Sequence, residues 1–266
     1  MDARFTVEVI SQTPNPQQTI YAAMHQDYAE DFVAHERETW PSEAQAGDVV
    51  IKNLLKGGRG HFGPLEHPQI VLNVGWFPHS TMQQIRTHRV GVSFDVQSFR
   101  YTGKRIYEFG KKLSGMGLTP FSGVEEKLFC YDDDGALKNE AESIFYLRPS
   151  GEYSDRQGKK YEYGKNRRDS HLEKVSEAAV DYFDDIESGL SEEHARGLIP
   201  FDVRQHWVMS ANVRSLMHLL DLRWKADAQL EAQQLCELAW PHFEAWVPAI
   251  AEWYAETRKC KARLAP

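Results

Sequence analysis

The sequence is poor in cysteine, with only three in 266 residues: Cys130, Cys236 and Cys260. An odd number without metal-type spacing argues against a disulfide framework and against a structural zinc site. The chain also contains no run of eighteen apolar residues, and it does not begin with a basic segment followed by an apolar one. We therefore expect neither a membrane-spanning helix nor a signal peptide, and we predict a cytoplasmic location.

Positive charge is also scarce, because 31 lysines and arginines stand against 39 aspartates and glutamates, a formal net charge of −8. A protein that holds nucleic acid through counterion release carries a surplus of basic residues. Nucleic acid is therefore not the expected main partner. The content of 41% hydrophobic and 12% aromatic residues is ordinary for a globular enzyme. The length suffices for one large domain or two small ones.

The most informative stretch runs from Gln83 to Tyr101, with the sequence QQIRTHRVGVSFDVQSFRY. It concentrates three kinds of side chain that a solvated surface helix does not need. These are the cationic or imidazole donors Arg86, His88, Arg89 and Arg100, the short polar groups Gln84, Gln97 and Ser98, and the aromatic rings Phe94, Phe99 and Tyr101. Guanidinium and imidazole groups suit phosphate and carbonyl oxygens, and the rings can wall a planar base. The combination indicates a nucleotide pocket.

The periodicity of this stretch changes at Gly91. Ser80 and Gln83 have the spacing of a capping box, which predicts a short helix over residues 81–88. Residues 92–101 alternate as in a strand. Gln84 and His88 would then approach from a helix, and Ser98 and Arg100 from one face of a strand. We expect the two pairs to converge on one ligand.

A second polar signal lies in SANVRSLMHLLDLR, residues 210–223. Helical spacing places Leu216, Leu219 and Leu220 on one stripe and leaves Arg214 and His218 as a separate polar patch. A structural interpretation is a leucine-rich helix with Asn212 as its cap and Arg223 favourable to the helix dipole. That interpretation does not account for the polar patch.

The rest of the chain predicts ordinary elements. HFGPLEH, residues 61–67, contains two histidines around a Gly-Pro turn, and because a helix breaker separates them we predict no metal site there. We expect strands at 5–10 and 68–77, helices at 17–38, 48–56 and 169–188, a helix after Ser191 that carries Arg196, and a helical tail over 227–261 interrupted at Pro241 and Pro248. The aromatic residues of that tail are typical of a core or a subunit interface.

Three segments resemble motifs of the flavin-dependent thymidylate synthases. THRVGVSFDVQSFRY is similar to their signature of Arg-His-Arg, seven residues, Ser and, two residues later, Arg. This chain departs from it in having Thr87 at the first arginine and eight residues between Arg89 and Ser98. HFGPLEH resembles His-x-x-Pro-Phe-Glu-His, with Leu65 at the aromatic position. SANVRSLMHLLDLR resembles Asn-Ala-Arg-Ser-Leu-Met-Asn-Phe-Leu-x-Leu-Arg, with His218 at the second asparagine.

The resemblance implies a single α+β domain over residues 1–266, in which a mixed sheet is flanked by helices with long C-terminal helices, and a homotetramer with active sites between subunits. It implies methylation of dUMP to dTMP, with 5,10-methylenetetrahydrofolate as carbon donor, NADPH as reductant and FAD carrying the hydride. The implied FAD-binding residues are Gly63, Thr87, His88, Arg89, Asn212, Arg214 and His218. The implied dUMP-binding residues are Gln84, Gln97, Ser98, Arg100, Arg196 and Arg223. We also expect Arg86 to reach a ligand phosphate and so to compensate for the arginine that Thr87 replaces.

Arg223 is our candidate for activating the uracil, because a guanidinium beside the ring carbonyl stabilises negative charge on the base. None of the three cysteines lies in a motif with a neighbouring base that would lower its thiol pKa, so we expect no cysteine nucleophile. We also expect Ser98 to serve as a phosphate donor and not as a nucleophile. The alternative class is a non-enzymatic single-stranded RNA-binding module that uses the same basic and aromatic clusters.

Overall fold

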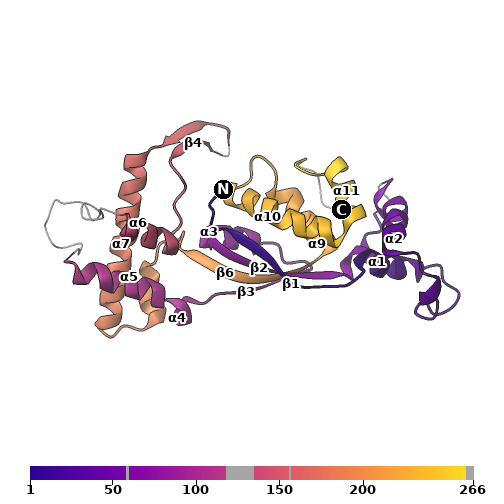
Figure 1. Cartoon of the computed structure of the whole chain (residues 1–266), viewed down its shortest axis with the longest axis horizontal. Coiled ribbons are helices and arrows are strands. Elements are labelled where there is room, and N and C mark those ends of the chain that lie inside the picture. Colours follow the sequence, from indigo (N-terminus) through magenta and orange to yellow (C-terminus); the bar gives the residue numbers. More distant parts are fainter. Residues whose placement is uncertain (58–59, 118–134, 156, 262–266) are drawn as a thin grey trace. The chain divides into compact units, whose positions relative to one another are not determined.

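The structure is a computed structural model that describes residues 1–57, 60–117, 135–155 and 157–261. The chain divides into two compact units (Figure 1). The first comprises residues 1–75, 83–95 and 207–266, and the second comprises residues 76–82 and 96–206. The prediction of one domain over the whole chain stays a prediction. Within the described residues, no helix is both long and apolar enough to cross a bilayer.

A four-stranded sheet has the strand order β1-β2-β6-β3. Its strands are β1 (Thr6–Gln12), β2 (Gln69–Pro78), β6 (Arg204–Asn212) and β3 (Val92–Val96). β1 and β2 are antiparallel, with a bulge between Val9 and Ser11. Successive side chains of a strand point to opposite faces, and in β2 the alternate residues Ile70, Leu72 and Val74 are buried. The strands expected at residues 5–10 and 68–77 are confirmed.

The first unit also contains helices. They are α1 (Pro16–His25), α2 (Glu43–Val50), α9 (Val213–Arg223), α10 (Leu230–Trp246) and α11 (Pro248–Thr257), with the short turns η1 (Arg37–Thr39), η2 (Ile51–Leu55) and η3 (Gly63–Glu66). α10 packs against β1 and α9 (Figure 1). The indole of Trp246 donates to the carbonyl of Thr13 at 3.0 Å, and His242 contacts the carbonyl of Val7 at 2.8 Å. Leu216, Leu219 and Leu220, which helical spacing places on one stripe, are all buried on α9.

The second unit is mainly helical. Its elements are α4 (Phe99–Thr102), α5 (Lys104–Gly115), α6 (Ala136–Ile144), the hairpin β4 (Gly151–Ser154) and β5 (Lys160–Tyr163), α7 (Lys165–Glu187), α8 (Glu192–Ala195) and η4 (Arg196–Leu198). α5 and α7 lie against each other and enclose an apolar cluster that includes Ile106, Phe109 and Leu172. α3 (His79–Ile85) begins in residues assigned to the second unit and ends in residues assigned to the first. The observed helices and sheet confirm the α+β class.

The helices predicted at 17–38 and 48–56 had wrong boundaries. The helix expected at 17–38 ends at His25, because Tyr28 and Phe32 are exposed and no buried apolar stripe continues it. The helix expected at 48–56 begins earlier, at Glu43. Its start is fixed by a capping box in which Ser42 accepts from the backbone N–H of Gln45 and Gln45 accepts from that of Ser42. It then continues as a single π-helical turn.

Proline was also misjudged in the C-terminal tail. Pro241 lies inside α10 and does not interrupt it, and the break comes at Val247, directly before Pro248. The neighbours Trp240 and Phe243 are buried, and this packing holds the helix together across the one hydrogen bond that a proline removes. The prediction that the tail's aromatic residues form core is confirmed for these two and for Trp246 and Tyr254.

Candidate functional site

The chain after α3 is fastened to the start of α9. Asn212 caps α9 by accepting from the backbone N–H of Ser215 at 2.8 Å, and the hydroxyl of Ser215 donates to the carbonyl of Val90 at 2.8 Å. Gly91 lies between these groups at φ +66°, and a Cβ there would stand 2.3 Å from the Ser215 hydroxyl. Only glycine fits this approach, so the turn between α3 and β3 is held directly against the cap of α9.

This fastening brings the end of α9 beside the end of α3. Arg223, the last residue of α9, donates from Nε to Nε2 of His88 at 3.0 Å. Its Nη2 donates to the carbonyl of Gln84 at 3.1 Å and to the hydroxyl of Thr87 at 2.9 Å. The Thr87 hydroxyl in turn donates to the carbonyl of Gln84 at 2.7 Å. Four residues that the sequence singled out therefore meet in one hydrogen-bonded group, which we call the Arg223 cluster: Gln84, Thr87, His88 and Arg223.

His88 is the buried member of the cluster, with 7% of its surface exposed. Its ring meets that of His218 edge to face, with centroids 5.3 Å apart. Burial, and after it the charge of Arg223 and the neighbouring His218, lower the pKa of His88 to about 4. The imidazole is therefore neutral at pH 7. Because its Nε2 accepts from Arg223, its proton is on Nδ1.

The lowered pKa of His88 makes a prediction about stability. Below pH 6.5 the unfolded chain takes up a proton at this residue, whereas the folded chain does so only near pH 4. The free energy of unfolding should therefore decrease as the pH falls, by about 2 kcal/mol between pH 7 and pH 5. Urea unfolding of the His88→Gln variant should lack this component of the pH dependence. His194→Gln, at an exposed position, is the control, and equal pH dependence in wild type and His88→Gln would refute the assignment.

Arg86 and Arg89 flank the Arg223 cluster on the exposed side of the turn. Neither makes a side-chain hydrogen bond or salt bridge with another residue that the structure describes. The helix was expected to continue to residue 88, but α3 ends at Ile85 and begins at His79, with Ser80 in its first turn. Beyond Ile85 the backbone tightens, because Thr87 bonds to Gln84 and His88 to Ile85, each three residues back. In an α-helix, neighbouring side chains such as those of Arg86 and Thr87 point about 100° apart around the axis. The tightened turn does not impose this separation.

The other predicted FAD-binding residues of the first unit have identifiable surroundings. Arg214 pairs with Glu66 at 2.6 Å and lies over the ring of Phe62, 5.9 Å from its centroid. Gly63 begins η3, and nothing lies within 4 Å of the position that a Cβ would take. Nδ1 of His218 is buried without a partner among the described residues. The guanidinium of Arg214, the uncovered backbone at Gly63 and the unsatisfied ring nitrogen of His218 fit a cofactor that has phosphate groups and a polar heterocycle.

The remaining predicted dUMP-binding residues belong to the second unit. We expected Ser98 and Arg100 on one face of a strand, and this was wrong, because β3 ends at Val96 and the chain enters α4 at Phe99. Ser98 precedes the helix and its carbonyl accepts from the Thr102 hydroxyl at 2.9 Å. Tight packing explains the early turn, since Phe99 lies against the apolar cluster of the second unit.

Arg100 and Arg196 are both exposed, but their surroundings differ. Arg100 pairs with Glu193 at 2.8 Å. Arg196 begins η4 and makes no side-chain hydrogen bond or salt bridge within the described part of the chain. Gln97 is held through its backbone, which donates to the carbonyl of His206 and accepts from the side chain of Gln205. Its side-chain oxygen is buried without a partner among the described residues, and so it is available to a ligand donor.

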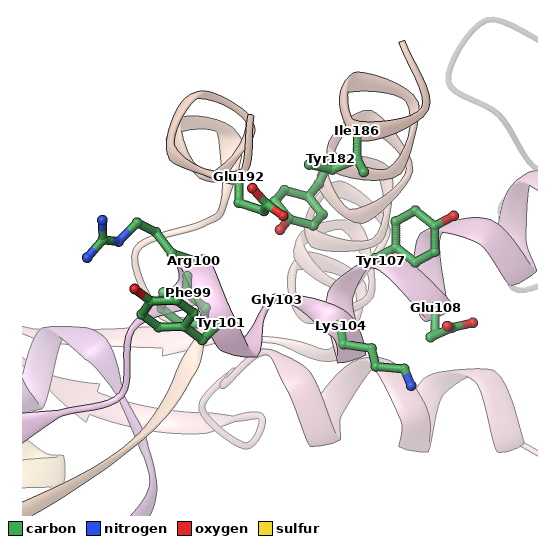
Figure 2. Close-up of a pocket in the computed structure, with 10 residues that line it drawn as sticks. All are labelled: Phe99, Arg100, Tyr101, Gly103, Lys104, Tyr107, Glu108, Tyr182, Ile186 and Glu192. Carbon is green, nitrogen blue, oxygen red and sulfur yellow. The ribbon is translucent and has the colours of Figure 1, made fainter. Parts of the chain in front are cut away.

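Beside Arg100 lies a pocket of about 350 Å³ (Figure 2). Tyr182 of α7 forms part of its wall and is 2% exposed. A Cβ at Gly103 would stand 2.3 Å from the Tyr182 hydroxyl, so only glycine allows α4 and α5 to approach this ring. Burial, and after it Glu192, raise the pKa of Tyr182, which keeps the phenol neutral. The residues that line the pocket are Phe99, Arg100, Tyr101, Gly103, Lys104, Tyr107, Glu108, Tyr182, Ile186 and Glu192.

Sequence reasoning missed Tyr182 and Glu192. Tyr182 lies on a helix that was predicted only as amphipathic, and its place beside Gly103 depends on the packing of α5 against α7. Glu192 was recognised as an acidic residue at a helix start, which gave no indication of a pocket. No local signal in the sequence distinguishes either residue from its neighbours.

The structure describes two of the three cysteines. Cys236 on α10 is fully buried, and burial raises the pKa of its thiol far above the ordinary range. Cys260 is exposed, and both are unpaired thiols. Cys130 lies outside the described residues. Within those residues, no group of three histidine, cysteine, aspartate or glutamate side chains has the arrangement of a metal site.

Comparison with known proteins gives consistent results. Residues 8–249 match the family described as thymidylate synthase complementing protein. The chain is 30% identical over 274 residues to the flavin-dependent thymidylate synthase of Halobacterium salinarum, covering 98% of this chain and 99% of that protein. It is also 30% identical over 269 residues to the corresponding protein of Haloarcula marismortui, with the same coverage.

Two solved structures share the fold. Thymidylate synthase X from Helicobacter pylori, solved with FAD and dUMP, has a TM-score of 0.62 and 16% identity, covering 91% of this chain and 96% of that one. The UMP/dUMP methylase PolB from Streptomyces cacaoi, solved with 5-Br dUMP, has a TM-score of 0.64 and 20% identity, covering 98% of this chain and 97% of that one.

Proposed function

This chain belongs to the flavin-dependent thymidylate synthase family and is an enzyme of that type, and from that premise we propose how it methylates dUMP to dTMP. The carbon donor is 5,10-methylenetetrahydrofolate and the reductant is NADPH. The methylene group of the folate forms a bond to C5 of the uracil, its two bonds to folate nitrogens break so that tetrahydrofolate leaves, the C5 hydrogen leaves as a proton, and a hydride completes the methyl group. Bound FAD would carry that hydride from NADPH. The enzyme acts as a homotetramer with active sites between subunits.

The observation that carries this proposal is the Arg223 cluster. Arg223 is charged at pH 7, and it is held by three hydrogen bonds to residues of the THR motif and the turn before it. A fixed guanidinium beside a uracil carbonyl stabilises the negative charge that develops on the ring when C5 attacks carbon. We assign Arg223 this activating role. No cysteine is needed to activate C5, and the buried thiol of Cys236 is protonated.

The residues around the cluster would hold the two nucleotides. Arg89 and Arg214 would bind the FAD phosphates, because cations suit anionic oxygens. Gly63 has no side chain and would let the cofactor come close to the protein backbone. His88 has committed Nε2 to Arg223, so its contact with FAD would use Nδ1. Asn212 has committed its side-chain oxygen to the helix cap, so its contact would use the amide nitrogen. His218 would donate or accept through its unsatisfied Nδ1.

The dUMP phosphate would be held by cations. In the second unit we assign this role to Arg100 and Arg196, with Ser98 and the side chain of Gln97 as polar contacts, and in the first unit we assign dUMP contacts to Arg86 and the side chain of Gln84. Guanidinium groups pair with phosphate oxygens through two parallel hydrogen bonds. In Arg100 this pairing would replace the exposed salt bridge to Glu193, and an exposed salt bridge contributes little to stability. Replacing this salt bridge with a phosphate contact should therefore cost little free energy.

Arg86 gives a specific prediction, because Thr87 stands where the motif has its first arginine. We expect Arg86 to reach a ligand phosphate from the tightened turn after α3. Arg86→Ala should weaken FAD or dUMP binding by about 1.5 to 3 kcal/mol, and Thr87→Ala should change affinity less. Calorimetric titration with each ligand measures this, with Arg167→Ala on the exposed face of α7 as the control. Normal binding of both ligands by Arg86→Ala would refute the compensation.

Purified protein tests the proposed function directly. Bound FAD should make the preparation yellow, and dUMP should perturb the flavin absorption spectrum. A single-stranded RNA-binding module would be colourless and would bind RNA with a steep dependence on salt. A colourless protein with salt-dependent RNA affinity would overturn the proposal, whereas dUMP-dependent spectral change with no RNA binding supports it.

A further inference from the structure

The hydrogen bonds of Arg223 leave it only one way to meet a ligand. A guanidinium has five N–H donors. The Nε proton is accepted by His88, and Nη2 donates to both the Gln84 carbonyl and the Thr87 hydroxyl. The two protons of Nη1 make no hydrogen bond with any residue that the structure describes. Nη1 is therefore the part of Arg223 that remains for a substrate.

Thr87 holds this arrangement in place with a single hydroxyl. It donates to the Gln84 carbonyl at 2.7 Å and accepts from Nη2 of Arg223 at 2.9 Å. The Gln84 carbonyl accepts from Nη2 as well, which closes a ring of three hydrogen bonds. A β-branched side chain has few χ1 rotamers, so the hydroxyl is pre-positioned for both partners. The ring restricts rotation of the guanidinium about its Cδ–Nε bond.

Two of the positions at which this chain departs from the family motifs contact the pair formed by Arg223 and His88. Thr87, at the position of the first motif arginine, bonds to Arg223. His218, at the position of the second asparagine of the other motif, packs its ring against that of His88. His88 is buried and neutral, so it can accept from Arg223 without opposing its charge. The substituted residues thus support the orientation of Arg223 from two directions.

We propose that Thr87 is a positioning residue that, together with His88, orients Arg223 so that only Nη1 faces the substrate. This inference rests on the proposed function. Bidentate pairing with a phosphate uses two N–H groups on one edge of the guanidinium, either Nη1 with Nη2 or Nε with Nη2. Each of those edges already contains a donor bound within the protein. Arg223 is therefore directed to a single carbonyl oxygen of the uracil, and phosphate binding falls to other arginines.

A purely structural role is the competing explanation, since the Thr87 hydroxyl also satisfies a carbonyl at the end of α3. The chain offers a matched control in Thr39, whose hydroxyl donates to the Glu36 carbonyl three residues back at 2.8 Å. Its backbone N–H bonds to the same carbonyl, as that of Thr87 does to Gln84. Within the described residues, Thr39 makes no hydrogen bond to an arginine. Thr39→Val removes the same local hydrogen bond without affecting a guanidinium.

The test compares Thr87→Val, Thr87→Ser and Thr39→Val with wild type, measuring kcat, KM for dUMP, flavin content and melting temperature. Thr87→Val should lower kcat by about 10- to 100-fold, because a hydrogen bond to a charged group is lost, with a smaller change in KM. Thr87→Ser keeps the hydroxyl and should restore kcat to within about threefold of wild type. Thr39→Val should leave kcat unchanged, and flavin content should be equal in all four proteins.

Each other outcome counts against the inference. Wild-type kcat in Thr87→Val, or an equal loss in Thr87→Ser, would show that the hydroxyl does not orient Arg223. Crystal structures of wild type and Thr87→Val provide a measurement that does not depend on turnover, and Nη2 should leave the Gln84 carbonyl in the variant. An unmoved guanidinium would overturn the inference even if the wild-type protein made no dTMP, a result that would refute the proposed function separately.

Discussion

Replacing Arg223 with alanine is expected to lower dTMP formation by about 10²- to 10³-fold while FAD stays bound. Loss of a donor that stabilises developing charge typically costs about 2.7 to 4 kcal/mol in the transition state. FAD should be retained because Arg223 is assigned to dUMP and because His88, its buried partner, stays in place. Single-turnover methylation and the flavin content of the purified variant measure the two parts of this expectation.

Arg223→Lys distinguishes charge from orientation. A lysine keeps the positive charge, but it has no planar group to bond simultaneously to His88, Gln84 and Thr87. We expect it to recover only a small part of the lost rate. Arg167→Ala, which removes an exposed arginine from α7, is the control for net charge. An unchanged rate in Arg223→Ala would show that the activating charge lies on another residue.

The second large effect is expected at Asp221, two residues before Arg223 on α9. Its carboxylate is completely buried, pairs with Arg258 at 2.5 Å and accepts from the Tyr254 hydroxyl at 3.0 Å. Asp221→Ala would remove this carboxylate from the mostly buried guanidinium of Arg258. Removing one member of a buried ion pair costs about 3 to 5 kcal/mol, so the free energy of unfolding should fall by that amount.

A double variant distinguishes the effect of leaving one buried charge from the effect of losing side-chain volume. In Asp221→Leu with Arg258→Met both charges are replaced by apolar groups, and such replacements are often neutral or stabilising. We expect denaturant unfolding to show most of the lost stability restored. Asp221→Ala should also lower turnover, because this network anchors the helix that ends at Arg223 to α11. Equal stability of wild type and Asp221→Ala would contradict the assignment.

The elements that could be predicted from the sequence are those with a strong local period. β2 and α9 were identified because their apolar residues recur at two and at three to four positions, and burial followed that pattern. The strand predicted through residue 101 failed for the converse reason. Its alternation continued past Val96, but Phe99 is drawn into the apolar cluster of the second unit and the backbone turns into α4.

The candidate site could be predicted only in its composition. The sequence identified His88 and Arg223 as chemically suited to a nucleotide site, and the structure brings them within 3.0 Å although 135 residues separate them. The role of Thr87 could not be predicted from the sequence, because the partners of its hydroxyl come from α3 and α9. The sequence showed Thr87 only as the absence of an arginine. Tyr182 was missed for a similar reason, since its neighbour Gly103 lies in the turn between α4 and α5, far from it in the sequence.

One measurement tests the central claim most directly: formation of dTMP from dUMP by wild type and by a variant with Cys130, Cys236 and Cys260 all replaced by serine. The assay contains 5,10-methylenetetrahydrofolate and NADPH, with parallel reactions that omit each. We expect both proteins to form dTMP at similar rates, and only when both co-substrates are present. A folded, flavin-containing triple variant that forms none would contradict activation of dUMP by Arg223 without a cysteine nucleophile.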